Sequence, residues 1–480
     1  MAESGRCMGE GRRMKATIAN RIFIDDPSDT VVQWVQENLK FPNPEYVKKE
    51  RMGFWTGRTP KELRLYEWNG NTLILPFGVC REIMPMLRGS AVYTDFRQNS
   101  VIDYGHESMG LYDYQKEAVV RLMDAKYGIL KATTGSGKTQ IGIALIKALR
   151  RRALWLCHTH DLLKQSVERA ERYIPKELIG TITEGKVNVG VGVTFATVQT
   201  MANLELTQYR DYWDVVIVDE AHRCSSSATS FTRYEKVLNH LAARRKYGLT
   251  ATPARSDGLI KATFALIGKV AYEVPEEAVA DRVMGVKIRK VVTDTGITDD
   301  CLNTDGTINY VKLIEHLTTD PERNRLIARK IMEEKGHSCL ILSDRLAQLE
   351  AIRALLPYEM QEKSAFINGK MTSKKAKAER EQAIEDMREG KINYLFSSTA
   401  LSKEGLDIPR LDRLFFASPV KFSAIVTQSI GRVRRTFEGK ETPVVYDFVD
   451  ENIGFCEKAY KERKRSYRKV GAEICEGLME

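Results

Sequence analysis

The sequence predicts an α/β protein made of two parallel-sheet domains in series, with a small α+β domain in front of them. From about residue 110, apolar runs typical of buried strands alternate with amphipathic helical segments, and the alternation restarts after about residue 280. Residues 14–105 follow a different pattern and hold three of the five tryptophans. The length of 480 residues agrees with about three domains of ~150 residues each.

The front region divides into a lead-in at residues 1–13 and an accessory domain at residues 14–105. The lead-in mixes Glu, Arg and Gly, which predicts disorder, and Met14 offers an alternative start. It has no apolar core of the kind that a secretory signal needs. Within the accessory domain, residues 31–39 have helical spacing and residues 72–75 (TLIL) predict a strand.

A basic segment of the accessory domain, residues 40–64, is a candidate nucleic-acid contact. It has seven basic and three acidic side chains, and Tyr46, Phe54 and Trp55 are interleaved with them. Cations suit phosphate contact and aromatic rings suit base stacking. The alternative is an ordinary aromatic core with a charged rim.

The first α/β domain is expected at residues 106–280. It contains the predicted strands 128–131, 153–157 and 214–219 and the predicted helices 140–150 and 162–173. The run 214–219 (DVVIVD) is apolar on both faces, as in a parallel sheet that helices cover on both sides.

The second α/β domain is expected at residues 281–456. Its predicted strands are 339–342, 392–397, 414–417 and 444–448, and its predicted helices are 347–356 and 373–388. Residues 293–306 are polar and predict a surface loop. A basic C-terminal helix is expected at residues 457–480, because residues 458–469 hold seven basic residues and one acidic residue. This helix is either a solvated surface or a nucleic-acid contact.

The composition excludes several classes of protein. With 43% hydrophobic and 29% charged residues, the chain is not a disordered tail, a fibre or a disulfide miniprotein. No apolar run approaches the ~20 residues of a membrane span. The net charge of +10 favours a polyanionic partner. Eight cysteines without a C-x-x-C pair argue against a zinc finger and fit a reducing cytoplasm.

Residues 132–139 (ATTGSGKT) predict a phosphate-binding loop between a strand and a helix. Such a loop needs glycines where the backbone approaches phosphate, and backbone N–H groups at a helix N-terminus. It also needs a lysine for the phosphates and a hydroxyl for Mg²⁺. Gly135, Gly137, Lys138 and Thr139 supply these groups. Ala132 stands where the first glycine of the pattern is usual, and the alternative is a chance Gly-rich turn.

An acid pair follows about 80 residues later, where the apolar run 215–218 leads into Asp219 and Glu220. In a parallel sheet, ligands bind at the carboxyl ends of the strands. One carboxylate can order Mg²⁺, and the other can orient and deprotonate a water molecule. Two acids in a loop are usually only solvated, but the apolar strand and the phosphate loop favour a site.

With these motifs, residues 111–450 resemble a superfamily 2 helicase of the DEAH-box type, with two RecA-like domains. Residues 111–115 (LYDYQ) resemble the adenine-reading element, of which only Gln115 is carried over because Tyr112 replaces the usual arginine. Residues 155–165 resemble motif Ia, with His158 and His160 where proline and arginine are usual.

The remaining motifs of the first domain resemble those that couple the nucleotide to the nucleic acid. Residues 194–200 (TFATVQT) are similar to motif Ib, which carries Thr197, and residues 249–253 (LTATP) match motif III. The resemblance implies that His222, Thr250 and Thr252 relay the nucleotide state to the strand groove.

The second domain continues the resemblance with motifs IV, V and VI. These are residues 340–345 (LILSDR) with Arg345, residues 398–409 (STALSKEGLDIP) with Thr399, Gly405 and Asp407, and residues 428–435 (QSIGRVRR) with Gln428, Arg432 and Arg435. Physically, a planar guanidinium can stabilise the charge that spreads over the γ-phosphoryl oxygens. An isolated basic helix would be the simpler interpretation of 428–435 without the other motifs.

The resemblance implies ATP and Mg²⁺ as cofactors and assigns roles to the residues. Phosphate and nucleotide contacts fall to Gln115, Thr134, Gly135, Ser136, Gly137, Lys138, Thr139, Gly405 and Asp407. Thr139 and Asp219 would hold the metal. Glu220 would activate water, assisted by Lys138, Gln428, Arg432 and Arg435. Thr197, Arg345 and Thr399 would contact or sense nucleic acid.

Two extensions narrow the family. Residues 253–258 (PARSDG) resemble the XPB, type III restriction and phage UvsW-like group, and residues 43–58 with 72–78 are similar to the front domain of UvsW-type branch-migration helicases. The implied protein is a cytoplasmic DNA helicase or translocase of a bacterial or phage-infected cell. It would act on single-stranded, forked or branched DNA in recombination or repair, with a single-strand-binding or recombination protein as a partner.

Three alternatives stay open at this stage. The chain could be the motor of a restriction-type complex, although no nuclease segment stands out. It could be an RNA helicase, against which the 253–258 extension counts. It could be an ATP-switched clamp that remodels protein–DNA complexes without separating strands.

Overall fold

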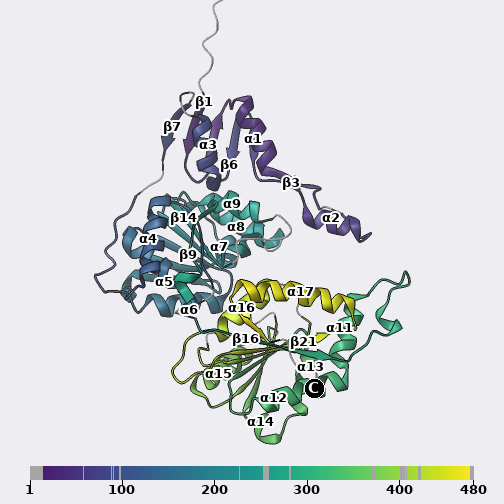
Figure 1. Ribbon diagram of the computed structural model, residues 1–480. Helices are drawn as coiled ribbons and strands as arrows, with labels where there is room; N and C mark the ends of the chain where they lie inside the picture. Colours follow the sequence, from purple (N-terminus) through teal and green to yellow (C-terminus); the bar gives the residue numbers. More distant parts are fainter. Residues whose placement is uncertain are drawn as a thin grey trace, which may run out of the picture. The chain divides into compact units, whose positions relative to one another are not determined.

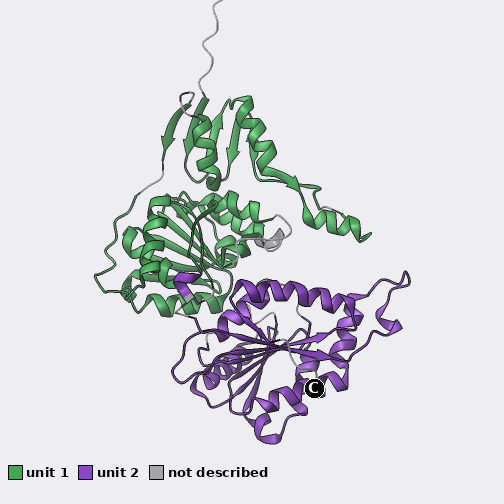
Figure 2. Cartoon of the chain, viewed as in Figure 1, with its two compact units in different colours: residues 1–133, 137–275 green, residues 134–136, 276–480 purple. Residues whose placement is uncertain are grey.

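The structure is a computed structural model that divides into two compact units, drawn in different colours in Figure 2. Unit 1 comprises residues 1–133 and 137–275, and unit 2 comprises residues 134–136 and 276–480. The described residues are 14–475 apart from 58, 88, 90, 97–98, 134, 226–227, 252–258, 281–282, 370, 372, 400–405, 407 and 420–422. The predicted lead-in therefore lies outside them.

A five-stranded sheet forms the front of unit 1. Its strands are β1 (Met14–Ile18), β2 (Ile22–Asp25), β5 (Glu67–Asn69), β6 (Thr72–Leu75) and β7 (Ala91–Asp95). Their order is β5-β6-β2-β1-β7, and only β1 and β7 run parallel. Helices α1 (Asp29–Leu39) and α3 (Cys80–Leu87) accompany this sheet (Figure 1). The predicted strand at 72–75 and helix at 31–39 are confirmed.

This front sheet shares its hydrophobic core with the α/β part of unit 1. The cluster that contains Ile22, Val31 and Leu73 also contains Ala262 and Ala265 of helix α9 (Ile260–Ile267). At Gly78, an added Cβ would lie 2.3 Å from the carbonyl oxygen of Phe264. The front sheet is therefore packed against α9 and is not a separately tethered domain.

An arm leaves the front sheet between α1 and β5, and it is built differently. Strands β3 (Lys40–Pro42) and β4 (Glu62–Arg64) pair with each other only, and the chain between them forms helix α2 (Pro44–Arg51), which lies at the far end of the arm (Figure 1). Asn43 caps α2 by accepting a hydrogen bond from the Glu45 N–H at 3.0 Å. Helix α2 has no buried residue, and Trp55 is 87% exposed. An aromatic core does not account for this segment.

The α/β part of unit 1 is an eight-stranded sheet with order β11-β10-β12-β9-β13-β14-β8-β15. All neighbours are parallel except β10 and β11. The strands are β8 (Gly128–Lys131), β9 (Ala153–Cys157), β10 (Ile179–Thr183), β11 (Lys186–Asn188), β12 (Val193–Thr197), β13 (Val215–Asp219), β14 (Arg245–Thr250) and β15 (Val270–Glu273). The helices are α4 (Asp113–Ala125), α5 (Lys138–Leu149), α6 (His160–Ala170), α7 (Val198–Asn203), α8 (Ala228–His240) and α9.

Unit 2 contains a seven-stranded sheet with order β18-β19-β17-β20-β21-β16-β22, parallel throughout. The strands are β16 (Lys287–Thr293), β17 (Cys339–Ser343), β18 (Ser364–Ile367), β19 (Tyr394–Ser398), β20 (Arg413–Phe416), β21 (Val444–Asp450) and β22 (Glu473–Cys475). The helices are α10 (Glu277–Ala280), α11 (Tyr310–Thr319), α12 (Pro321–Glu333), α13 (Leu346–Ala354), α14 (Tyr358–Glu362), α15 (Lys374–Glu389), α16 (Ser423–Val433) and α17 (Gly454–Lys469).

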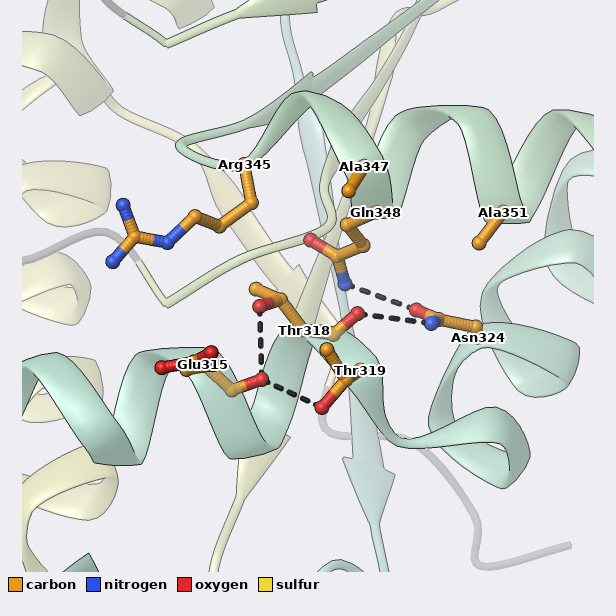
Figure 3. Close-up of a pocket in the computed structure, with 8 residues that line it drawn as sticks. All are labelled: Glu315, Thr318, Thr319, Asn324, Arg345, Ala347, Gln348 and Ala351. Atoms are coloured by element: carbon orange, nitrogen blue, oxygen red, sulfur yellow. Dashed lines mark hydrogen bonds between the residues drawn. The ribbon is translucent and has the colours of Figure 1, made fainter.

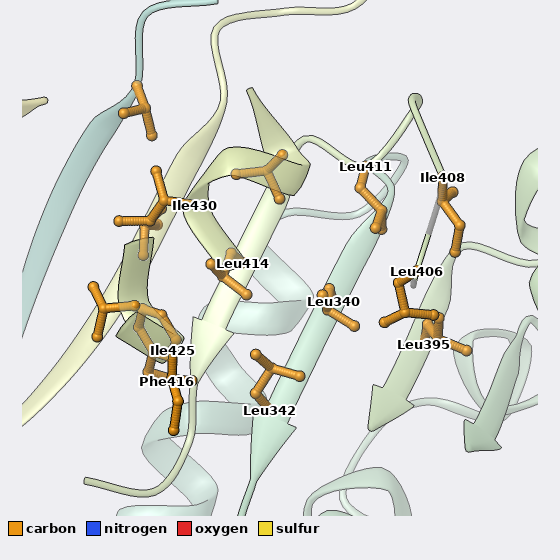
Figure 4. Packing of buried hydrophobic residues seen from close by; sticks show 14 of the residues in the cluster. Leu340, Leu342, Leu395, Leu406, Ile408, Leu411, Leu414, Phe416, Ile425 and Ile430 are labelled. Carbon is orange, nitrogen blue, oxygen red and sulfur yellow. The ribbon is translucent and has the colours of Figure 1, made fainter. Parts of the chain in front are cut away.

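Both faces of the unit 2 sheet are buried, and successive strand residues show this directly. Leu340 and Leu342 belong to the cluster drawn in Figure 4, whereas their neighbours Cys339 and Ile341 belong to a second cluster. Because side chains alternate across a strand, the two clusters lie on opposite faces. This explains why the sequence shows continuous apolar runs at these strands.

Two expectations about unit 2 change with the structure. The predicted surface loop at 293–306 contains Cys301, which is 1% exposed and packs with Leu313, Leu317 and Ile453, so the loop carries a small core of its own. The predicted basic helix at residues 457–480 is present as α17, but it ends at Lys469, β22 follows it, and its Tyr460 and Tyr467 belong to the main core. Within the described part of the chain, no helix is long and apolar enough to cross a membrane.

Candidate nucleotide site

The phosphate loop connects β8 to α5 and turns at its two glycines. Gly135 and Gly137 have φ angles of 92° and 76°, which L side chains rarely adopt. Gly137 is the N-cap of α5, and no side chain caps the helix. The first N–H groups of α5 are thus directed towards the loop, as an anion site requires. Ser136 is buried, and the predicted contact Thr134 lies outside the described residues.

Lys138 and Gln115 both lie against this loop. The Lys138 ammonium donates to the carbonyl oxygens of Ala132 and Thr133, at 3.3 Å each. An added Cβ on Gly137 would lie 2.4 Å from the Gln115 amide nitrogen, and the Gln115 amide oxygen accepts from the Tyr112 N–H at 3.1 Å. The structure therefore brings the predicted adenine-reading residue to the predicted phosphate loop.

The acid pair follows the fully buried strand β13. Asp219 is 6% exposed and its Oδ1 accepts from the Glu220 N–H at 3.0 Å. Glu220 has a φ of 49°, in the left-handed region that is uncommon for a non-glycine residue. Its carboxylate lies 3.2 Å from His222 Nδ1, and that nitrogen is 3.0 Å from the Thr250 hydroxyl. One chain of contacts thus joins the acid pair to β14.

The two neighbouring carboxyl groups differ in their electrostatics. Burial, followed by the adjacent Glu220 charge, raises the pKa of Asp219 above its usual value. Burial also acts to raise the pKa of Glu220, but its hydrogen bond to His222 and the charge of Lys138 lower it overall. A divalent cation would favour the ionised form of Asp219. Carboxylate and hydroxyl oxygens are the ligands that Mg²⁺ prefers, so Asp219 and Thr139 fit this metal.

The strand order places these motifs side by side at one edge of the sheet. Strands β9, β13, β14 and β8 are consecutive neighbours. The Ala132 N–H donates to the Thr250 carbonyl oxygen at 3.0 Å. Thr197, at the end of β12, is 6% exposed and donates its hydroxyl proton to Thr200 at 2.9 Å. Thr252 lies outside the described residues, and the roles of these threonines stay predictions.

His158, an unusual residue in the motif Ia segment, is half-buried and lies against the buried Tyr234. Its ring stacks on that of Tyr234, with centroids 6.3 Å apart. Burial, with the nearby Arg223, His222 and Arg233, lowers the pKa of His158 to about 4. His158 Nδ1 and the Tyr234 hydroxyl are both buried, and neither has a hydrogen-bond partner among the described residues. A neutral His158 can therefore give no charge-based phosphate contact near neutral pH.

In unit 2, the predicted Arg432 and Gln428 lie on α16, and Arg435 follows it. Arg432 is 8% exposed and donates to the Leu406 carbonyl oxygen of the motif V segment. Gln428 and Arg435 are half-buried. A side-chain hydrogen bond from motif VI to a main-chain carbonyl of motif V thus connects the two motifs. Gly405 and Asp407 lie outside the described residues.

Lys440 is a positioning residue that the sequence did not reveal. Its ammonium donates to the carbonyl oxygens of Val433, Arg435 and Pro409 at 2.6, 2.8 and 2.8 Å. A cation at the C-terminus of α16 also interacts favourably with the helix dipole. Lys440 therefore fixes the end of motif VI against the end of motif V. It lies outside every motif, so no local pattern indicates this role.

The predicted nucleic-acid residues of motifs IV and V, Arg345 and Thr399, differ in their exposure to solvent. Arg345 is exposed beside a pocket of about 420 Å³ at the start of α13, lined also by Glu315, Thr319 and Gln348 (Figure 3). Gln348 Nε2 donates to Asn324 at 3.0 Å, which fixes one side of the pocket. Thr399, in contrast, is 1% exposed. Their predicted nucleic-acid roles stay predictions.

Two family models match the chain. Residues 108–255 match the Type III restriction enzyme, res subunit, and residues 322–437 match the Helicase conserved C-terminal domain. Together they include the phosphate loop, the acid pair and the arginines of α16. The two matches identify the two domains of a superfamily 2 helicase, a class of ATP-dependent enzymes, and the first match is to the res-subunit model of type III restriction enzymes.

Curated relatives agree with this class. The chain is 26% identical to the putative ATP-dependent RNA helicase L396 of Acanthamoeba polyphaga mimivirus, over 71% of this chain and 64% of that protein. It is 25% identical to the DNA 3'-5' translocase XPB2 of Sulfurisphaera tokodaii, over 68% of this chain and 79% of that protein. The chain spans less than two thirds of the mimivirus relative's length.

Solved structures share the fold. A fragment of a putative HsdR subunit of a type I restriction enzyme from Vibrio vulnificus aligns with 77% of this chain and 68% of its own, with a TM-score of 0.56 and 17% identity. T4 UvsW also aligns, with 97% of this chain and 99% of its own at 18% identity, but its TM-score of 0.41 is too low to show a shared fold.

Proposed function

We propose that this protein is an ATP-dependent DNA helicase or translocase that acts on forked and branched DNA. One observation carries the proposal. The phosphate loop, the acid pair and the His222–Thr250 contact lie next to one another at the carboxyl ends of neighbouring strands in the eight-stranded sheet. A phosphate cradle beside two carboxylates is the arrangement that phosphoryl transfer to water requires.

Unit 1 binds the nucleotide in this proposal. The N–H groups of α5 and the Lys138 ammonium hold the β- and γ-phosphates. Thr139 and Asp219 hold Mg²⁺, which when bound neutralises charge on the phosphate oxygens. Glu220 orients the attacking water and accepts its proton. Its contact with His222 reports the state of that carboxylate to Thr250, on the strand that leads into motif III.

The proposal assigns stabilisation of the transition-state charge to two arginines of unit 2. Arg432 and Arg435 stabilise charge that grows on the γ-phosphoryl group in the transition state, and Gln428 assists them. The Lys440 contacts keep the end of α16 in place while this happens. Binding energy that appears only in the transition state raises turnover rather than affinity.

The arm at residues 40–64 supports DNA as the substrate. Phe54 and Trp55 are 60% and 87% exposed, and aromatic rings exposed beside cations suit bases that are unstacked at a fork. The relative XPB2 is named as a DNA translocase, whereas L396 is named as an RNA helicase. RNA is therefore the second candidate substrate.

Strand displacement separates these candidates. The full chain is incubated with ATP and Mg²⁺ on forked DNA, four-way DNA and matched RNA forks. We expect displacement of the DNA forks and junctions with little activity on RNA. Equal or greater activity on RNA would establish an RNA helicase. ATP hydrolysis stimulated by DNA without any displacement would establish a translocase or clamp instead.

A further inference from the structure

A strongly charged surface of unit 2 has no part in the proposed nucleotide chemistry. It is the outward face of α17, here called the α17 stripe, formed by the exposed residues Lys458, Lys461, Arg465, Arg468 and Lys469. At 3.6 residues per turn, these five side chains fall within ~100° of arc and extend for ~17 Å along the helix. The stripe is therefore a straight row of cations.

Buried contacts on the inward face of α17 keep the opposite face, which carries the stripe, exposed. Arg463, on that face, donates from Nε and Nη2 to the two oxygens of Asp447 on β21, at 2.8 and 2.9 Å. The Tyr467 hydroxyl donates to the same carboxylate at 2.6 Å. All three groups are at most 2% exposed. The strand β22 then returns the chain to β16. The contacts with Asp447 therefore fix the middle of the helix, and the pairing of β22 with β16 fixes the chain that follows it.

The stripe has only partial charge compensation, from Glu457 and from the exposed Glu462 beside Lys458 and Arg465. Lys461 pairs with Glu457 at 2.6 Å. Among the described residues, Lys458, Arg465, Arg468 and Lys469 form no ion pair. Like charges three or four residues apart on a helix destabilise it. Helix α12 differs, because its Arg325 and Lys330 pair with Glu322 and Glu333. A row of cations that outnumber their acidic neighbours is stabilised when a polyanion lies along it.

We infer that the α17 stripe binds the sugar–phosphate backbone of duplex DNA, an inference that rests on the proposed function. A duplex segment of ~17 Å carries ~5 phosphates per strand, comparable with five cations. The stripe itself contains no aromatic residue, because Tyr460 and Tyr467 face the core. Single-stranded sites combine cations with stacking rings, whereas duplex backbone contacts need cations alone. The arm with Trp55 has the first composition, and the stripe has the second.

The test compares three variants of the full chain. The first, Lys458→Gln/Arg465→Gln/Arg468→Gln, removes three charges from the stripe. The matched control, Arg325→Gln/Lys330→Gln/Lys335→Gln, removes three charges that are already paired in the same unit. The second control, Lys458→Arg/Arg465→Lys/Arg468→Lys, keeps the stripe's charge. Affinity for a blunt duplex and for single-stranded DNA is measured at several salt concentrations, with ATPase activity without DNA and thermal unfolding measured alongside.

We expect the stripe variant to bind duplex more weakly. The plot of log K against log salt should also become less steep by about 2–3, because each phosphate that is no longer neutralised reduces the magnitude of the negative slope by ~0.9. Both controls should keep the parent slope, and ATPase activity without DNA should not change. An equal slope change in the paired-charge control would overturn the inference, as would a greater weakening of single-strand binding than of duplex binding. A parent chain that binds no DNA would instead refute the proposed function.

Discussion

Units 1 and 2 each contain a largely parallel sheet, but they hold their candidate catalytic groups in different ways. In unit 1 the groups belong to strand ends and adjacent loops, so Lys138, Asp219 and Glu220 are placed by the main chain beside them. In unit 2, Arg432 of α16 donates to the Leu406 carbonyl oxygen, 26 residues away, and Lys440 donates to the carbonyl oxygens of Val433 and Arg435. Under the proposed function, we expect the unit 1 groups to serve both nucleotide binding and, through Glu220, its hydrolysis, and we expect the unit 2 arginines to serve the rate of hydrolysis.

The largest expected effect tests the unit 2 half of this comparison. Arg435→Ala should lower kcat by ~10³–10⁵, the usual worth of an arginine that stabilises phosphoryl transfer, while the Kd for ATP changes little. Single-turnover hydrolysis and nucleotide binding measure the two quantities separately. Normal kcat with a raised KM would show that Arg435 only helps binding.

The second test concerns the acid pair of unit 1. Glu220→Gln keeps the size of the side chain but removes the proton acceptor, so hydrolysis should fall by ~10²–10⁴ while ATP and DNA still bind. Lys138→Ala should instead weaken nucleotide binding itself. Glu177→Gln, an exposed glutamate of the same unit, is the matched control and should behave as the parent. Hydrolysis by Glu220→Gln at the parent rate would refute the assigned base.

Within unit 1, the arm can be separated from the ATP site. Trp55→Ala should weaken binding to forked DNA by ~5–150-fold, the worth of one stacked base, without changing ATPase activity in the absence of DNA. Trp213→Ala is no suitable control because that ring is buried, so exposed Val191→Ala serves instead. Unchanged fork affinity in Trp55→Ala would exclude stacking at the arm.

The smallest expected effect tests positioning in unit 2. Lys440→Met removes the three carbonyl contacts but keeps the length of the side chain, and we expect kcat to fall ~10-fold at nearly constant KM. Lys440→Arg should restore part of the rate, since a guanidinium can still donate to carbonyl oxygens. A change in thermal stability without any change in kcat would show that Lys440 has only a structural role.

The sequence predicts most of what is local. The strands at 72–75, 128–131 and 153–157 are predicted with their observed bounds, because each is a short apolar run between turn residues. The phosphate loop and the acid pair are equally local, and their contacts with Gln115 and His222 follow the expected motif order.

What the sequence does not predict depends on distant contacts. Strand β14 begins with Arg245 and Lys246, which are polar residue types, yet Lys246 is 1% exposed and donates to the Leu238 carbonyl oxygen at 2.6 Å. In the sequence, residues 14–105 look like an independent domain. The structure shows that they share a core with α9, and no local pattern indicates this because the core joins segments about 190 residues apart, as Leu73 and Ala262 show. Charge counts alone also cannot distinguish the exposed arm from the anchored helix α17.

The most direct test of the account is steady-state ATP hydrolysis by the full chain with and without forked duplex DNA, in parallel for Glu220→Gln and Arg435→Ala. We predict that DNA stimulates the parent enzyme, that both variants still bind ATP, and that neither recovers the parent rate when DNA is added. Hydrolysis that forked DNA does not stimulate, or that persists in both variants, would contradict the proposed DNA motor.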